Sequence, residues 1–285
     1  LIDLDKNLRK MGLGMLDPPS FVTSKYSYDF INRLLDIIYE SSSLTELYTE
    51  YTDTIFTYKE FYTTINKTFT YDNFYTPDKS FFKTTIYNDI DELDIEITHI
   101  RDKLNAICNR LSSIIDVPNS CKFDNNDKYG YFLYCTKNRS KVLDQRFKNI
   151  SNHVINIRDT NKNVIFEIES NAFNYKPKDN TNVFIESPEI NELSIKLQVS
   201  VQKMKTLNQT YWNQTMNDLF IKYNPTLQRL HQFVADVDVS STIAKISIHN
   251  KYCKPELIDN WKSCVVAQDI RHPIVERIAV DSEFI

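Results

Sequence analysis

Glycine is nearly absent from this chain, since only Gly12, Gly14 and Gly130 occur among 285 residues. Phosphate-binding loops need glycines for positive φ angles and for close approach of the backbone to the ligand. Neither G-x-x-x-x-G-K-[ST] nor G-x-G-x-x-G is present, which excludes a complete nucleotide site of either kind within these residues. Tight β-hairpins also depend on glycine, so sandwiches and barrels with many turns are disfavoured. The composition therefore favours helices.

Apolar residues recur at helical spacing over two long stretches. The first stripe consists of Ile90, Leu93, Ile97, Ile100, Leu104, Ile107 and Leu111, and its alternating spacing of three and four predicts a helix over residues 87–113 with a coiled-coil-like seam. Ser187 as the N-cap and Pro188 at the first helical position predict the start of the second helix. Asn224-Pro225 is expected to end it.

Two further helices are expected, over residues 26–50 and from Thr226 to about His249, because both segments carry apolar residues at spacings of three and four. The aromatic segment 51–82 is compatible with either helix or strand. Between the two longest helices, residues 128–136, 163–170 and 183–185 are rich in β-branched and aromatic residues and predict short strands.

The predicted strands coincide with a change in charge. Residues 122–179 carry 11 Lys or Arg and 7 Asp or Glu, whereas residues 1–121 carry 12 and 19. A basic segment between acidic ones favours contact with a polyanion, although a lysine-rich solvated surface gives the same pattern. We therefore expect a mainly α protein in which long antiparallel helices carry a small, basic, antiparallel β-rich insertion at their distal end.

Seven cations and one amide in the insertion are candidate contacts to the phosphate backbone of such a polyanion: Lys137, Asn138, Arg139, Lys141, Arg146, Lys148, Lys176 and Lys178. Phosphate contacts use cations with polar helpers, and we expect these residues on flexible or β-edge positions. No element that would read base edges is evident, so binding without sequence preference is expected.

Other chemistry is not supported by the sequence. The spacing of His249, Cys253, Cys264 and His272 loosely resembles a zinc finger, but the paired Cys-x2-Cys is missing and no metal site is expected. The five scattered cysteines are interpreted as reduced thiols of an intracellular protein. Carboxylates at positions 89, 91, 94, 236 and 238 fit helix ends or solvated faces, so no catalytic residues are assigned. No apolar run is long enough to span a membrane.

Four segments carry a resemblance to a known family. They are RHPIVE (residues 271–276), FVADVDVSSTIAKIS (233–247), SPEINELSIKL (187–197) and YGYFLYCTKNRSKVL (129–143). Together they resemble the middle of MutS-family DNA mismatch-repair proteins. Residues 4–38 resemble the first lever helices of the family, but the usual Thr and Arg are absent around Gly12 and Gly14.

The resemblance implies four parts: first lever helices (1–121), a clamp insertion (122–186), returning lever helices (187–268) and the start of a truncated ATPase domain (269–285). It implies no enzymatic activity and no cofactor in this fragment. For a longer protein it implies a homo- or heterodimer on duplex DNA that uses ATP and Mg²⁺, with Phe284 packing on the adenine. The alternative from another class is a helical scaffold that binds proteins, in which the basic segment is incidental.

Overall fold

The computed structural model describes residues 2–76, 78–149, 153–158, 164–259, 263–268, 270, 272 and 274–275. The chain divides into two units, Leu1–Ala235 and Asp236–Ile285. Helix α7 (Pro188–Asn250) contributes residues to both units. The other elements named below belong to the first unit. None of the helices in the described ranges is long and apolar enough to cross a lipid bilayer.

The first unit begins with α1 (Leu4–Gly12), α2 (Pro18–Tyr39), α3 (Ser42–Leu47), the 3-10 helix η1 (Thr49–Tyr51), α4 (Thr52–Thr68) and the 3-10 helix η2 (Tyr71–Tyr75). Asp17 sets the start of α2, because its carboxylate accepts a hydrogen bond from the amide of Ser20 at 3.0 Å. The single helix expected over residues 26–50 is replaced by two helices, α2 and α3. The first begins earlier than expected, and the chain breaks between them before Ser42.

Trp212 of α7 is the centre of the core beneath these helices. Four phenylalanine rings lie with their centroids 5.4–5.8 Å from the indole: Phe21, Phe69, Phe74 and Phe81. The indole Nε1 donates a hydrogen bond to the carbonyl oxygen of Leu16 at 2.8 Å. The aromatic segment 51–82 is thus helical over α4, and its remainder, which includes η2, contributes rings that fill this core.

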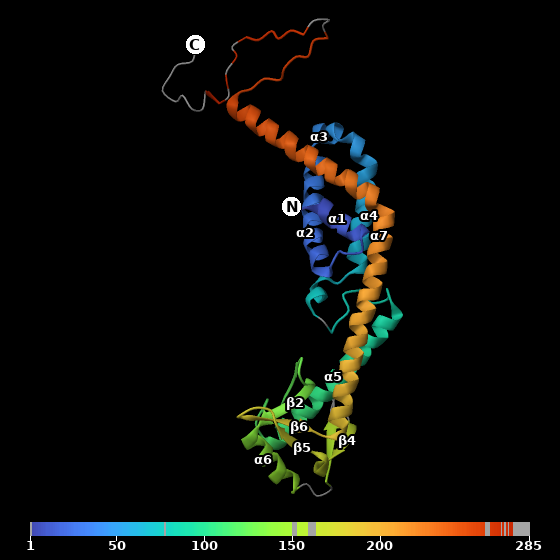
Figure 1. Ribbon diagram of the computed structural model, residues 1–285, viewed down its shortest axis with the longest axis vertical. Helices are drawn as coiled ribbons and strands as arrows, with labels where there is room; N and C mark the ends of the chain where they lie inside the picture. Colours follow the sequence, from blue (N-terminus) through green and yellow to red (C-terminus); the bar gives the residue numbers. More distant parts are fainter. Residues whose placement is uncertain are drawn as a thin grey trace. The chain divides into compact units, whose positions relative to one another are not determined.

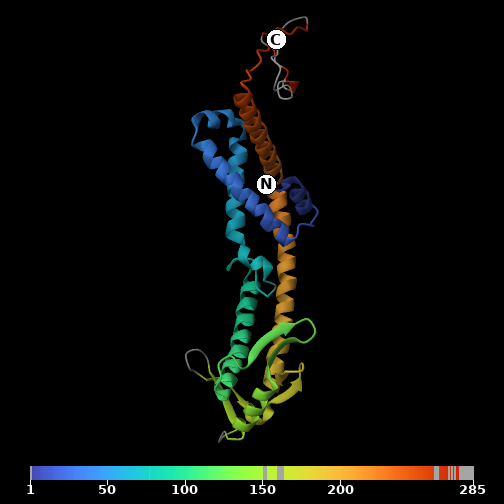
Figure 2. The ribbon, with the colours of Figure 1, turned by 90° about the vertical axis from the view of Figure 1, so that its left-hand side faces the viewer.

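Helices α5 (Asn88–Ile115) and α7 lie side by side and run antiparallel (Figures 1 and 2). The Tyr87 ring stacks on that of Tyr211 at 3.8 Å between centroids, and Lys196 pairs with Glu96 at 3.2 Å, so residue numbers fall along α7 as they rise along α5. All seven stripe residues predicted for α5 are buried. The expected mainly α architecture with antiparallel long helices is confirmed.

In its described residues, the segment between α5 and α7 forms two small antiparallel sheets, one α-helix and a short 3-10 helix. Its elements are β1 (Lys122–Asn126), β2 (Gly130–Thr136), α6 (Lys137–Phe147), β3 (Val154–Arg158), β4 (Val164–Glu169), the 3-10 helix η3 (Ser170–Ala172), β5 (Asn174–Pro177) and β6 (Asn182–Glu186). One sheet has the order β1-β2-β6-β5, and β3 pairs with β4. Within the first unit this segment lies at one end of the α5–α7 pair, and α1 to α4 lie toward the other (Figure 1).

The predicted end of the long helix at Asn224-Pro225 is wrong. Helix α7 continues through Pro225 to Asn250, and the apolar side chains of Leu227, Leu230 and Phe233 beyond the proline are fully buried. A proline removes one backbone donor and disfavours the turn before it, but tertiary packing on both sides outweighs that local cost. The predicted start is correct, since the amide of Ile190 donates to the Ser187 hydroxyl at 3.2 Å.

Candidate nucleic-acid interface

Helix α6 holds five of the eight candidate phosphate contacts: Lys137, Asn138, Arg139, Lys141 and Arg146. The expectation of flexible or β-edge positions is therefore wrong for these five. Thr136 starts the helix by accepting a hydrogen bond from the Arg139 amide at 3.4 Å, and Ser140, Leu143 and Phe147 form its buried face. Because this face has only two large apolar residues, the sequence pattern does not indicate a helix and suggests a basic loop.

The two arginines of α6 hold the fold together. Arg139 donates from Nη1 to the carbonyl oxygen of Ser120 at 3.2 Å, and Arg146 donates from Nη1 to that of Ile114. Ile114 lies in the last turn of α5, where backbone carbonyls lack a partner within the helix and carry partial negative charge. Arg146 thus fastens α6 to the end of α5, and Arg139 fastens it to the loop that precedes β1. Both are intramolecular roles that compete with phosphate binding.

We expect Arg139→Met to lower the free energy of unfolding by about 1–3 kcal/mol, because the partly buried carbonyl of Ser120 loses its charged donor. Lys141→Met is the matched control on the same helix and should change stability by less than about 0.5 kcal/mol, since Lys141 is exposed. Urea denaturation followed by circular dichroism measures both. Equal effects from the two variants would contradict the structural role of Arg139.

Three lysines also have intramolecular partners. The Nζ of Lys137 donates to the carbonyl oxygen of Asn180 at 2.8 Å, and Lys176 pairs with Glu186 at 2.6 Å. The Nζ of Lys178 lies 3.7 Å from the centroid of the Tyr134 ring. Each of these contacts anchors a cation to the sheet, so all three lysines are less available to a ligand than sequence suggests.

The turn between β5 and β6 carries a fixed negative charge. Hydrogen bonds donated by the Asn182 side chain, and by the backbone amides of Thr181 and Asn182, hold the pKa of the Asp179 carboxyl well below its usual range. Asp179 therefore stays ionised throughout the physiological pH range and repels an anion near this turn. Sequence reasoning missed this residue, although D-x-T-N is a typical Asx-turn pattern.

The remaining candidates, Asn138, Lys141 and Lys148, form one surface together with Gln145, and we call these four residues the α6 outer face. Their spacing of three, four and three places them on one side of the helix, opposite Leu143 and Phe147. All four are exposed, and among the described residues neither lysine has an ion-pair or hydrogen-bond partner. The exposed Asp144 lies three positions after Lys141 and four before Lys148, so this face also carries one carboxylate. The two ammonium groups and the two amides are groups that suit contact with a phosphate backbone. Gln145 was missed in the sequence, although the spacing reveals it.

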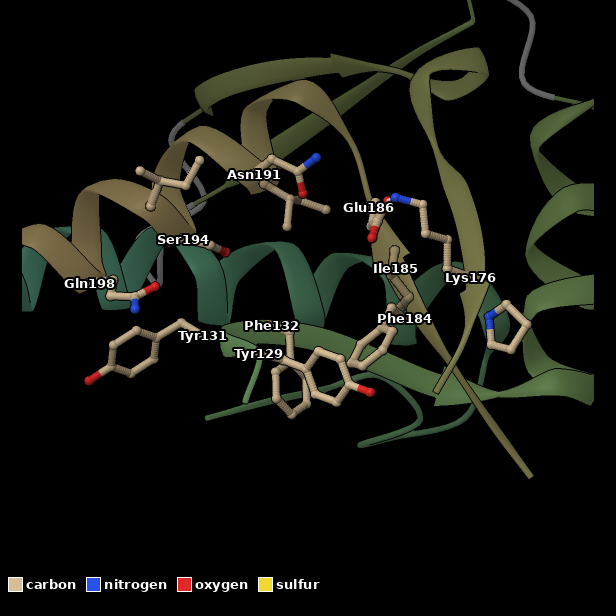
Figure 3. A pocket seen from close by; sticks show the side chains of 13 residues that line it. Tyr129, Tyr131, Phe132, Lys176, Phe184, Ile185, Glu186, Asn191, Ser194 and Gln198 are labelled. Atoms are coloured by element: carbon tan, nitrogen blue, oxygen red, sulfur yellow. Dashed lines mark ion pairs between the residues drawn. The ribbon is translucent and has the colours of Figure 1, made fainter. Parts of the chain in front are cut away.

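A pocket of about 470 Å³ lies between the four-stranded sheet and the first turns of α7 (Figure 3). Its aromatic wall consists of Tyr129, Tyr131, Phe132 and Phe184, and α7 contributes Asn191, Ser194 and Gln198. The Lys176–Glu186 ion pair at its margin neutralises the pocket's cation. The pocket therefore offers apolar and amide surface without a free charge. It adds no positive charge to that of the α6 outer face.

Gly130 permits this arrangement. Its φ is +65°, and a Cβ at this position would lie 2.5 Å from the Gln198 side-chain oxygen. We expect Gly130→Ala to destabilise the chain by about 1–2 kcal/mol from the left-handed backbone alone. Gly14→Ala is the control, because it shares the positive φ but meets no atom within 4 Å. If the contact with Gln198 also matters, Gly130→Ala should lower the thermal unfolding midpoint more than Gly14→Ala does. Equal losses for the two variants would exclude a contribution from that contact.

The other predicted sites have simple outcomes. Asp89 accepts a hydrogen bond from the Tyr211 hydroxyl at 2.8 Å, and Asp91 accepts one from the Thr85 amide at 2.7 Å, so both stabilise the start of α5. No group of three or more His, Cys, Asp or Glu suited to a metal ion occurs among the residues that the structure describes. Phe284, assigned to adenine packing, lies outside the described residues.

No family model matches the chain. Individual proteins do match. A protein named as a MutS homologue for DNA mismatch repair, from Acanthamoeba polyphaga mimivirus, is 24% identical over the whole chain, which covers 26% of that protein. The DNA mismatch repair protein MutS of Clostridium perfringens is 23% identical, again over the whole chain and 28% of the relative. This chain is related to the MutS proteins. MutS of Clostridium botulinum matches 51% of it at 24% identity.

The chain thus spans about a quarter of the length of the MutS relatives that match all of it. Both full-length alignments include the β-containing segment and α7. The relationship therefore covers the residues that form the α6 outer face, although at this identity it does not assign a role to any one of them.

Proposed function

We propose that this chain is the lever and clamp portion of a MutS-like mismatch-repair protein, and that the α6 outer face contacts the phosphate backbone of duplex DNA. In this proposal residues 1–121 and 187–268 are the lever helices, residues 122–186 are the clamp, and residues 269–285 begin an ATPase domain. The observation that carries the proposal is a pair of exposed lysines, Lys141 and Lys148, without an ion-pair or hydrogen-bond partner in the described part of the chain, at the sheet end of two antiparallel helices.

Electrostatics supports contact with the backbone and not with bases. The α6 outer face presents ammonium and amide groups on one exposed helix surface, whereas the neighbouring β5–β6 turn carries the ionised Asp179. A surface with few free cations binds weakly and without sequence preference, because phosphate contacts carry no base information. In the longer protein, ATP and Mg²⁺ would be bound outside the lever and clamp, and dimerisation would bring two clamps to one duplex.

Salt-dependent binding of the 285-residue chain to a fluorescently labelled duplex tests the proposal. We expect the logarithm of the binding constant to fall linearly with the logarithm of salt concentration between about 50 and 200 mM, with the same affinity for a duplex of scrambled sequence. Binding that is absent or insensitive to salt would contradict the proposal and favour the helical scaffold. A strong preference for one sequence would contradict backbone contact.

A further inference from the structure

Two buried thiols face each other where the chain leaves α5 and enters the sheet. Lys122 of β1 pairs with Tyr134 of β2 in the antiparallel register. Continuing that register by one residue places Cys121 opposite Cys135. Both side chains are buried, with exposed fractions of 4% and 2%. Neither is part of the α6 outer face, so they have no role in the proposed function.

The backbone geometry suits a covalent bond between these residues. The amide of Cys121 donates to the Ser112 hydroxyl at 3.0 Å, which directs it away from the β1–β2 ladder. Opposed residues that do not exchange backbone hydrogen bonds have Cα atoms about 4.5 Å apart and side chains close together. A disulfide spans Cα separations of about 4.4–6.8 Å. The strand pairing can therefore accept a disulfide without a change of register.

The surroundings make the two thiols unequal. A hydrogen bond from Cys135, opposed by burial and assisted by Ser120, Ser112 and the nearby Arg139 guanidinium, lowers the pKa of the Cys121 thiol. The same hydrogen bond, together with burial, raises the pKa of Cys135. The hydrogen bond between the two sulfur atoms therefore favours the thiolate at Cys121 and keeps the proton on Cys135, which makes Cys121 the better nucleophile of the two.

We propose that Cys121 and Cys135 form a redox-active pair that a hydroperoxide oxidises to an intramolecular disulfide. The Cys121 thiolate attacks one peroxide oxygen, the O–O bond breaks, and the leaving oxygen takes a proton to become water or an alcohol. The Cys135 sulfur then attacks the resulting sulfenic acid, the S–O bond breaks as the S–S bond forms, and the Cys135 proton leaves with the second water. Two thiols lose two electrons and the peroxide gains them.

The disulfide would fasten the segment that follows α5 to the central strand β2. It would close a loop that contains the whole β1–β2 hairpin, including the aromatic residues Tyr129 and Tyr131 that line the pocket. Because such a loop restricts the unfolded chain, the oxidised protein should have a higher thermal unfolding midpoint than the reduced protein.

Peptide mapping tests the assignment on the 285-residue chain, in a background where the exposed Cys253 and Cys264 are replaced by serine. After hydrogen peroxide treatment, free thiols are blocked with N-ethylmaleimide under denaturing conditions, and the digest is analysed by mass spectrometry. We expect a cross-linked peptide joining Cys121 to Cys135. This cross-linked peptide should disappear when the protein is reduced with dithiothreitol. The thermal unfolding midpoint should be higher in the oxidised than in the reduced protein.

Cys108 supplies the matched control, because it is also buried and its pKa is raised by burial and by the charge of the nearby Cys121. The cross-link should persist in Cys108→Ser and disappear in Cys121→Ser and Cys135→Ser. Recovery of Cys121 and Cys135 as maleimide adducts after oxidation of the background protein would overturn the proposal, as would a cross-link to Cys108. The mapping of the background protein does not depend on the folding of any of these three variants or on DNA binding.

Discussion

Replacement of Trp212 with alanine is expected to lower the free energy of unfolding by about 3–5 kcal/mol, the largest effect of any single substitution considered. The indole is 1% exposed, contacts four phenylalanine rings and donates a hydrogen bond to Leu16. Alanine would leave a cavity that the surrounding rings, contributed by α2 and by the segment after α4, cannot fill without moving those elements.

Ile221→Ala is the control for this variant, because Ile221 lies on the same helix but is 70% exposed. Its effect should stay within about 0.5 kcal/mol. Urea denaturation followed by far-ultraviolet circular dichroism measures both variants without relying on tryptophan fluorescence. Similar midpoints for the two variants would show that the aromatic cluster is not the core that joins α7 to the N-terminal helices.

Replacing Lys141 and Lys148 together with alanine is expected to reduce the salt dependence of duplex binding. If each lysine neutralises one phosphate, the slope of log binding constant against log salt becomes shallower by about 1.8 in the double variant. Affinity at low salt should fall equally for duplexes of different sequence, because no base contact is lost. Fluorescence anisotropy titrations at several salt concentrations provide the measurement.

Lys6→Ala with Lys67→Ala is the matched control, since it removes the same charge from exposed positions on α1 and α4. This control separates a local contact from a change in net charge. A slope that is unchanged in the Lys141/Lys148 variant, or equally reduced in the control, would contradict the assignment of the α6 outer face.

The long-range architecture could be predicted because it depends on local patterns. The seven stripe residues of α5 specify one buried face without any knowledge of the partner helix. Helix α6 was missed because its buried face includes Ser140 and only two large apolar residues, which is too weak a pattern to recognise. Pro225 misled the prediction for the opposite reason: a strong local signal is overruled by packing on both sides of it.

The sequence could not show which cations are held by intramolecular contacts and which are free to bind a ligand. Arg139 and Arg146 reach carbonyl groups that are 19 and 32 residues earlier in the chain, and only the folded structure brings them together. In sequence they are indistinguishable from Lys141. The same holds for Asp179, whose effect on a nearby anion depends on the path of the β5–β6 turn.

The contacts between α5 and α7 limit how the two helices can move. The Tyr87–Tyr211 stack and the Lys196–Glu96 pair lie at different heights along the two axes. Sliding one helix past the other by a single turn, about 5.4 Å, would separate both pairs at once. The two contacts therefore oppose sliding of one helix along the other, whereas bending or tilting of the two helices together would leave both contacts intact.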